Sequence, residues 1–576
     1  MVLPTWRSAL ASLALLVLPA PVRGQTATPI AHLIVVVGEN LSFDNLFGTY
    51  ESRSNAKIRN LLSQGIVNRD GSPGPEFSMA AQRRAEVRDI YQVMPHIVGT
   101  YGEVPRPGTT YAPGLPRFAP DARFPALLPN GPFQITKHID YTAAVGDPVH
   151  RFFQMWQQVD GGRRDLFVWV DETSGEGSQN RADPASGTNQ GAVAMGFYSM
   201  ATGDAPYFRQ LADSYALSDN HHQPVMGGTG ANFQALATGH AIAYTQEGSP
   251  AEPPPDQVEN PDPRPGSNNW YTHSGYRSGS YTECSDPSQP GISSIRAYLG
   301  SLPYRTLNDG NCEKDAYYLV NNYNPGYLGD GTPAPLGSTQ FTIPPTTQNN
   351  LALLLNHHNV SWKYYGEGWD GGKEDGEAGT YCNICNPFLY STQIMTDPVQ
   401  RAKNQDINDL YTDLQNNTLP AVSIVKPDGI LDGHPASSKL ELFEGYVEKI
   451  VEMAKADPKV WDDTAIMITM DEGGGYYDSG YVQPIDFFGD GTRIPLLVVS
   501  KYSQGGRVVH TYYDHVSFDK FVEANWGLGQ TISLRSRDNL PNPIPTAGNA
   551  YAPANAPAIG NLMDMFHFAD IPGATD

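Results

Sequence analysis

The chain has 576 residues, of which 61 are acidic and 38 are lysine or arginine, so its formal net charge at pH 7 is −23. Such an acidic chain lacks the basic surface that binds a phosphate backbone, and we expect no nucleic-acid partner. The charge also disfavours docking on anionic lipid, but it leaves open a phosphate substrate that is held by a metal ion and by helix dipoles.

Residues 1–24 have the pattern of a secretory signal. Arg7 precedes an apolar stretch without charge from Ala9 to Ala20, and a small-residue cleavage site follows at 22–24. The stretch is too short to span a bilayer, and no later segment has the length and apolarity of a transmembrane helix. We therefore expect a secreted or periplasmic protein with no transmembrane anchor. The sequence carries no signal for an oligomeric state.

Apolar runs along the chain predict strands, and segments with helical spacing lie between several of them. Continuous apolar runs are typical of buried parallel strands. Their alternation with helices predicts an α/β fold with a mainly parallel central sheet that is flanked by helices. The predicted strands are 32–37, 165–170, 214–218, 360–365, 421–425, 464–470 and 494–500; the predicted helices are 401–415, 438–456, with Ser437 or Ser438 as its cap, and 515–525.

Two stretches interrupt this pattern. Residues 245–345 are rich in Pro, Gly, Asn, Ser and Tyr, and residues 70–135 are similarly irregular. Their aromatic side chains can pack, whereas a disordered linker carries few aromatics. We therefore predict a single domain over 25–576 with large loop insertions near 70–135 and 245–345.

The four cysteines predict two disulfides. An exported protein can keep disulfides, and an even number of cysteines fits this. We favour Cys284–Cys312 and Cys382–Cys385 because both pairs are local in the sequence. A redox-active or metal-binding role for the second pair, which has C-x-x-C spacing, is the alternative.

Two short polar clusters each follow an apolar run directly, at opposite ends of the chain. Glu39 and Asn40 follow the run at 32–38, and Asp471 and Glu472 follow the run at 464–470. Ligand sites in α/β sheets lie beyond the carboxyl ends of the strands, so we expect the clusters to meet there. Three carboxylates and an amide suit one hard divalent ion, Ca²⁺ or Mg²⁺; solvated acids at two strand ends are the alternative.

Thr229 is a candidate nucleophile. It stands in a Gly-Gly-Thr turn after the predicted strand 214–218, where a helix can begin. A helix N-terminus has free N–H groups that suit a phosphate, and metal coordination favours the alkoxide of a threonine. On these residues alone, an ordinary threonine in a turn is the alternative.

Six short segments in a fixed order carry a resemblance to a known family. They are 39–48, 150–154, 228–232, 428–435, 471–472 and 514–517, and together they span nearly the whole chain after the signal. In this order they resemble the bacterial phosphoesterase family of non-hemolytic phospholipases C and acid phosphatases. The segment at 39–48 indicates the family even by itself. The segment at 228–232 is weak evidence alone and becomes strong evidence only in this order.

The resemblance implies an alkaline-phosphatase-like core and a set of site residues. It implies that a divalent ion, with Zn²⁺ as an alternative identity, is bound by Glu39, Asn40, Asp471 and Glu472 together with the nucleophile Thr229. It implies catalytic histidines around the phosphate, for which His434, His150, His357 and His358 are the matching candidates, with His138 as an alternative to His150. It implies substrate-binding asparagines, for which the candidates are Asn232 and, within 321–324, Asn322 and Asn324. His221, His222 and His515 remain open between structural and catalytic roles.

The leading hypothesis is a secreted, metal-dependent acid phosphatase that hydrolyses phosphate esters through Thr229. Several family members have Ser at this position, and phospholipase members often carry a C-terminal extension, whereas only residues 516–576 follow His515. The alternative is a phospholipase C that cleaves phosphatidylcholine. A second alternative is an inactive surface-binding protein on the same fold.

Overall fold

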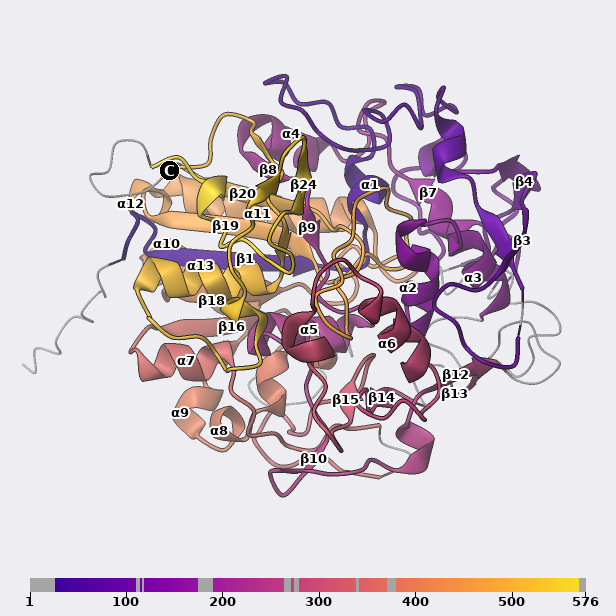
Figure 1. The fold of residues 1–576 in the computed structure, drawn as a ribbon. Coiled ribbons are helices and arrows are strands. Elements are labelled where there is room, and N and C mark those ends of the chain that lie inside the picture. The colour runs from indigo at the N-terminus through magenta and orange to yellow at the C-terminus, as the bar shows by residue number, and fades with distance from the viewer. Residues whose placement is uncertain are drawn as a thin grey trace, which may run out of the picture.

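An eight-stranded sheet lies at the centre of the computed structural model (Figure 1). The structure describes residues 26–86, 88–109, 114–116, 119–174, 190–263, 271–273, 279–337, 341–369 and 380–568, so the predicted signal segment lies outside it. The strands, in spatial order, are β17 (Asn404–Gln405), β16 (Trp362–Gly366), β18 (Val422–Lys426), β1 (His32–Gly38), β19 (Thr464–Met470), β20 (Leu496–Ser500), β8 (Ala216–Ser218) and β21 (Val508–Val509).

The sheet is mainly parallel, as predicted. Strands β17, β16, β18, β1 and β19 run parallel to one another, and β8 runs parallel to β21. Strand β20 is antiparallel to both of its neighbours, β19 and β8. The strands at the centre are buried on both faces, which is why their sequences read as continuous apolar runs. The α/β class and the mainly parallel sheet are thus confirmed.

The prediction of a strand at 165–170 is wrong. Most of this run forms the helix α3 (Phe167–Thr173), whose residues Phe167 to Asp171 are all buried. A short helix that is buried all round shows no amphipathic period, so a run of this length cannot be told from a buried strand. The other predicted strands are confirmed within a few residues at their ends.

Helices cover both faces of the sheet. Along β1, Ile34 and Val36 pack into one apolar cluster, and Leu33, Val35 and Val37 pack into a second on the opposite face. This alternation follows from the two-residue period of a strand. The first face is covered by α4 (Pro206–Ser214), α10 (Ile407–Asn416) and α11 (Leu440–Ala456); the second by α5 (Thr229–Thr238), α7 (Leu351–His357) and α13 (Val516–Trp526), which lies in front of the strands in Figure 1.

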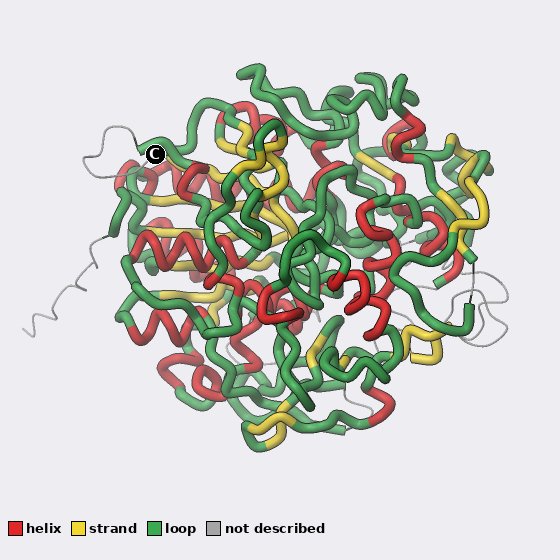
Figure 2. Tube along the Cα trace, in the orientation of Figure 1, coloured by secondary structure: helices red, strands yellow, loops and turns green. Residues whose placement is uncertain are grey.

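Beside the sheet the chain forms mostly loops with short elements, as Figure 2 shows. The helices there and at the margins are α1 (Phe43–Phe47), α2 (Phe152–Val159), α6 (Ile292–Gly300), α8 (Thr392–Met395), α9 (Pro398–Arg401) and α12 (Pro458–Trp461). The two-stranded pairs are β2 (Arg83–Ala85) with β3 (Ile97–Thr100), β4 (Glu103–Pro105) with β5 (Leu127–Pro129), β6 (Phe133–Gln134) with β7 (Gly196–Phe197), β9 (His221–His222) with β22 (Tyr513–Asp514), β10 (Thr245–Gln246) with β11 (Ser249–Pro250), β12 (Asn260–Pro263) with β13 (Tyr271–His273), β14 (Tyr281–Thr282) with β15 (Tyr318–Leu319), and β23 (Pro545–Thr546) with β24 (Asn549–Pro553). The stretches expected to be insertions contain several of these short pairs, joined by loops. The single domain stays a prediction.

Both predicted disulfides are present. Cys284 pairs with Cys312 and Cys382 pairs with Cys385.

None of the helices within the described residues is long and apolar enough to cross a membrane.

Candidate active site

The two acidic clusters meet at the carboxyl edge of the sheet. Strands β1 and β19 are neighbours in a register that places Gly38 opposite Met470, so Glu39 and Asp471 leave the sheet at the same level. The backbone N–H of Asn40 donates to Asp471 Oδ1 at 3.0 Å, and that of Asp471 donates to the carbonyl of Gly38 at 3.0 Å. Two segments that are more than 400 residues apart in the sequence thus lie side by side at the end of the sheet.

Thr229 lies at this site as the first residue of α5. Its side chain is 6% exposed, and its Oγ1 donates to Glu39 Oε2 at 3.3 Å. The neighbouring N–H groups of the helix are already paired: Gly230 N–H donates to Asn322 Oδ1 at 2.7 Å, and Ala231 N–H donates to the carbonyl of Asn321 at 3.1 Å. These two N–H groups are therefore not free to bind a phosphate, contrary to the expectation from the sequence.

Several buried oxygen atoms at the site have no hydrogen-bond partner within the described structure. They are Asn40 Oδ1, Asp471 Oδ2 and both carboxylate oxygens of Glu472. Burial raises the pKa of Asp471 and of Glu472 well above their ordinary values, and the neighbouring carboxylates raise them further. Buried charges without partners are costly unless a counter-charge compensates them. Carboxylate and amide oxygens are donors that a hard divalent cation prefers, so the chemistry of the predicted ligand residues is compatible with this role.

Lys426 is a site residue that the sequence analysis missed. It ends β18, is 1% exposed, and places its Nζ 3.2 Å from Glu39 Oε1 and 2.8 Å from Asp432 Oδ2. Burial raises the pKa of Glu39, but the charges of Lys426 and His434 outweigh burial and lower it. Its position directly after the predicted strand 421–425 could have indicated it, because a lysine at a buried strand end is almost always paired with an acid.

His434 contacts Asn40, one of the predicted metal ligands. Its Nε2 lies 3.0 Å from Asn40 Nδ2, and its Nδ1 hydrogen-bonds the carbonyl of Pro435. In the neutral ring, an Nδ1–H donor and an Nε2 acceptor satisfy both contacts, whereas the protonated ring also carries a proton on Nε2. Burial lowers the pKa of His434, but the charges of Asp147, Glu39 and Asp432 outweigh burial and raise it.

The turn that carries His434 is held by Ser438. The Ser438 hydroxyl donates to the carbonyl of Ile430 at 2.8 Å and accepts from Gly433 N–H at 3.1 Å. The prediction that Ser437 or Ser438 caps the following helix is wrong, because Lys439 is at the N-cap without a side-chain hydrogen bond.

His150 lies in a loop that is fastened to the segment beside Thr229. Two residues later, Phe152 N–H donates to Asn321 Oδ1 at 3.0 Å. The His150 ring is buried, with Nδ1 2.7 Å from the carbonyl of Pro148 and 3.5 Å from Asp147 Oδ1. A role in phosphate binding stays a prediction. The alternative, His138, packs against the ring of Phe124 in a different part of the molecule.

The structure does not bring His357 and His358 to this site. They lie at the end of α7, just before β16 begins, and the centroids of their rings are 4.8 Å apart. Strand β16 runs parallel to β18 and β1, so its start lies at the amino edge of the sheet. A five-residue strand separates the two edges by on the order of 16 Å. The geometry contradicts the prediction that these histidines surround the phosphate.

The predicted asparagines have different roles. Asn232 Oδ1 accepts from Val225 N–H at 3.0 Å, and its Nδ2 donates to the carbonyls of Gly227 and Gly228. These bonds shape the turn before Thr229, so the prediction that Asn232 binds substrate is wrong. Asn322 reaches the start of α5. Asn324 accepts from Asn383 Nδ2 at 3.2 Å, further from Thr229.

The other histidines near the site support its walls. His515 Nε2 lies 2.8 Å from the carbonyl of Asp471, and burial lowers the pKa of His515 to about 4, so the neutral ring donates to that carbonyl. The His222 ring hydrogen-bonds Gly491 and Asn220. His221 packs against the rings of His515 and Phe518. These contacts favour structural roles.

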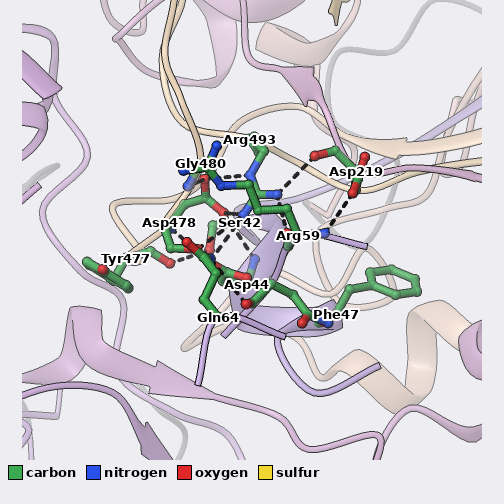
Figure 3. Close-up of polar contacts among 12 residues, drawn as sticks. Ser42, Asp44, Phe47, Arg59, Gln64, Asp219, Tyr477, Asp478, Gly480 and Arg493 are labelled. Carbon is green, nitrogen blue, oxygen red and sulfur yellow. Dashed lines mark hydrogen bonds and ion pairs between the residues drawn. The ribbon is translucent and has the colours of Figure 1, made fainter. Parts of the chain in front are cut away.

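A buried arginine joins the two acidic loops (Figure 3). Arg493 is fully buried; its Nε lies 2.9 Å from Asp478 Oδ2, and one terminal nitrogen lies 3.2 Å from Asp44 Oδ2. Asp44 also accepts from Ser479 N–H at 2.7 Å, and Ser42 donates to the carbonyl of Tyr477 at 2.8 Å. The loop after Glu39 is thereby fixed to the loop after Glu472.

Comparisons with known proteins identify the family of the chain. A family model described as "Phosphoesterase family" matches residues 30–529. Phospholipase C B of Mycobacterium tuberculosis is 26% identical over 327 residues, 48% of this chain and 61% of the relative. Non-hemolytic phospholipase C of Burkholderia pseudomallei is 26% identical over 325 residues, 48% of this chain and 43% of the relative. A probable acid phosphatase of Kluyveromyces lactis is 24% identical over 220 residues, 36% of this chain and 50% of the relative.

The chain matches 61% or less of the length of these relatives. Among solved structures, a protein in the alkaline phosphatase superfamily from Vibrio parahaemolyticus is similar at a TM-score of 0.25 and 10% identity, over 55% of this chain and 59% of that one. This likeness is too weak to carry an argument.

The Arg493 network predicts a large loss of stability for Arg493→Met. The substitution leaves Asp44 and Asp478 buried without their cation, and breaking a buried pair in this way costs about 3–5 kcal/mol. The free energy of unfolding, measured with denaturant, should fall by about this amount. Arg305→Met, which removes an exposed ion pair with Asp309, is the matched control and should cost far less. Equal losses for the two variants would contradict the role of Arg493.

The unpartnered carboxylates predict opposite effects of Asp471→Asn with and without metal. In chelator-treated protein the substitution removes a buried charge, so the unfolding temperature should rise. With Ca²⁺ or Mg²⁺ present, it should bind less metal and gain less stability from metal than the parent protein. Thermal unfolding and elemental analysis measure the two effects. The exposed control Asp462→Asn should change neither; an Asp471→Asn variant that binds metal as the parent does would refute the ligand assignment.

Proposed function

We propose that this chain, which belongs to the phosphoesterase family, is an exported metal-dependent acid phosphatase that hydrolyses phosphate monoesters through Thr229. The observation that carries the proposal is the position of Thr229. Its Oγ1 lies 3.3 Å from Glu39 Oε2, beside buried oxygens of Asn40, Asp471 and Glu472 that have no partner in the described structure. Hydrolysis of phosphoric esters in general, without the choice of substrate, agrees with the family and with the phospholipase C and acid phosphatase relatives.

The chemistry follows from what the uncatalysed reaction lacks. Phosphate monoester hydrolysis is among the slowest known reactions in water, so a site must hold a nucleophile in line and neutralise charge. A divalent ion bound by the proposed ligands Glu39, Asn40, Asp471 and Glu472 supplies charge neutralisation and favours the alkoxide of a coordinated threonine. All four offer oxygen atoms, which favours Ca²⁺ or Mg²⁺ over Zn²⁺.

Thr229 forms the new bond in the first step. Its Oγ1 attacks phosphorus, the bond from phosphorus to the alcohol oxygen breaks, and a phosphothreonine forms. Glu39 Oε2, which accepts the hydrogen bond of Thr229, takes the hydroxyl proton, and His434 donates a proton to the departing oxygen. In the second step His434 takes a proton from the water that hydrolyses the phosphothreonine, and Thr229 regains its proton from Glu39. Lys426 holds one oxygen of Glu39 at 3.2 Å, so the other oxygen is directed toward Thr229.

A phospholipase C is the second candidate, because several relatives carry that name. It would share the core chemistry and would accept a choline phosphodiester. Parallel assays with p-nitrophenyl phosphate and p-nitrophenyl phosphorylcholine distinguish the two, since a phosphatase prefers the first. The two disulfides support the proposed export, since disulfides persist in oxidising compartments.

Thr229→Ala should lower kcat by at least about a thousandfold, the scale seen when a catalytic nucleophile is lost. Thr229→Ser keeps a hydroxyl at the start of α5 and should remain active. Steady-state rates with p-nitrophenyl phosphate measure both, and Thr412→Ala on the exposed face of α10 is the control. An alanine variant that keeps a tenth of the parent rate would refute the nucleophile.

His434→Ala should affect poor leaving groups most. An alkyl alcohol needs a proton as it departs, so loss of the general acid should cost at least about a hundredfold in kcat. p-Nitrophenol needs little protonation, and the loss with its ester should be much smaller. His567→Ala, at an exposed position, is the control. Equal losses for both esters would indicate phosphate binding rather than proton donation.

A further inference from the structure

A cavity of about 350 Å³ lies where the segment after Asn322 meets the loop of the Cys382–Cys385 disulfide. Six of the residues that line it provide its aromatic rings and polar side chains: Asn324, Tyr327, Thr342, Trp369, Tyr381 and Asn383. The roles proposed above for Thr229, the metal ligands and His434 make no use of it. Its volume is at the lower end of the range for sites that bind small molecules.

Two segments that line the cavity also contact the candidate active site, one beside Thr229 and one at Glu39. Asn324 lies two residues after Asn322, whose Oδ1 accepts from Gly230 N–H. Two residues of chain span at most about 7 Å. On the other wall, Asn383 lies between Cys382 and Cys385, and Cys385 Sγ is 3.3 Å from Glu39 Oε1. Both walls of the cavity therefore continue into the site.

The two walls also contact each other. Asn383 Nδ2 donates to Asn324 Oδ1 at 3.2 Å, which joins the segment at 321–324 to the disulfide loop. A phosphate ester that reacts at Thr229 has its alcohol a few bonds from the phosphorus. The contacts through Asn322 and Cys385 give the direction in which such an alcohol would extend to meet the cavity.

The lining indicates the chemistry of that alcohol. The described residues that line the cavity include no charged side chain. Trp369 and Tyr381 place their ring centroids 5.4 Å apart at an interplanar angle of 49°, so they present aromatic surface at the cavity. The amides of Asn324 and Asn383 add donors and acceptors. Aromatic faces together with amides suit an uncharged ring that carries hydroxyl or ring-nitrogen groups.

We propose that this cavity binds the alcohol part of the substrate and selects monophosphates of uncharged, hydroxylated ring compounds. Hexose phosphates and nucleoside monophosphates share this chemistry. The inference rests on the proposed phosphatase function. The two long acyl chains of a diacylglycerol exceed a cavity of about 350 Å³, so the cavity favours a phosphatase over a phospholipase C.

A substrate panel tests the selectivity. Asn383→Ala should lower kcat/KM for a hexose 6-phosphate or a nucleoside 5′-monophosphate by roughly tenfold or more, because a site built for a polar group loses its partner. Methyl phosphate, which has no ring, should change by less than about twofold. Asn408→Ala, at an exposed position on α10, is the matched control. A loss of the same size for methyl phosphate would overturn the proposal, because it would place Asn383 in the support of Glu39.

A binding measurement tests the cavity without catalysis. Free nucleoside or free hexose, titrated into the metal-loaded protein, should change the tryptophan fluorescence with saturation. Trp369→Phe should abolish that change, and Trp526→Phe on α13 should keep it. A parent protein that binds neither compound up to millimolar concentration would overturn the cavity assignment. A parent that binds one of them but hydrolyses no phosphate monoester would refute the proposed function and leave the cavity assignment intact.

Discussion

The buried guanidinium of Arg493 fixes the distance between two loops that are more than 400 residues apart in the chain. It forms ion pairs with Asp44 and Asp478, and all three side chains are inaccessible to solvent or nearly so. Buried ion pairs contribute little net stability, because desolvation offsets their attraction, but a missing partner is severely penalised. The network therefore acts mainly on geometry: the loops reach a low free energy only in the arrangement that places Glu39 beside Asp471.

Electrostatics within the site oppose this arrangement. Burial and mutual repulsion raise the pKa values of Asp471 and Glu472, whereas Lys426 keeps the pKa of Glu39 low. The single positive charge of Lys426 cannot neutralise the charges of Glu39, Asp471 and Glu472 together. The folded scaffold thus holds the acids where either proton uptake or a further cation relieves the repulsion between them. The His515 ring and the Arg493 network supply the rigidity that keeps the acids in place.

Sequence periodicity was sufficient for the sheet and for the two acidic clusters, because buried parallel strands are apolar throughout and their carboxyl ends share one edge. It failed at 165–170, where a buried helix carries the same apolar pattern. The histidine pair at 357–358 was misplaced because residue type says nothing about which edge of a sheet a loop occupies. Lys426 and Arg493 were missed because each also pairs with an acid in a distant segment, Glu39 and Asp44, and the sequence does not show that these segments meet. Asn232 was misassigned because a side chain that shapes a turn resembles one that binds a ligand.

The disulfide between Cys382 and Cys385 has a consequence for metal selection. Cys385 Sγ lies 3.3 Å from Glu39 Oε1, and with the bond closed neither sulfur is a thiolate. Reduction would place two thiols next to a carboxylate, a donor set that prefers soft ions such as zinc over calcium or magnesium. An oxidising compartment therefore does more than stabilise the loop. It removes sulfur from competition for the ion of the proposed site, so the order of oxidation and metal loading would decide which ion that site takes up.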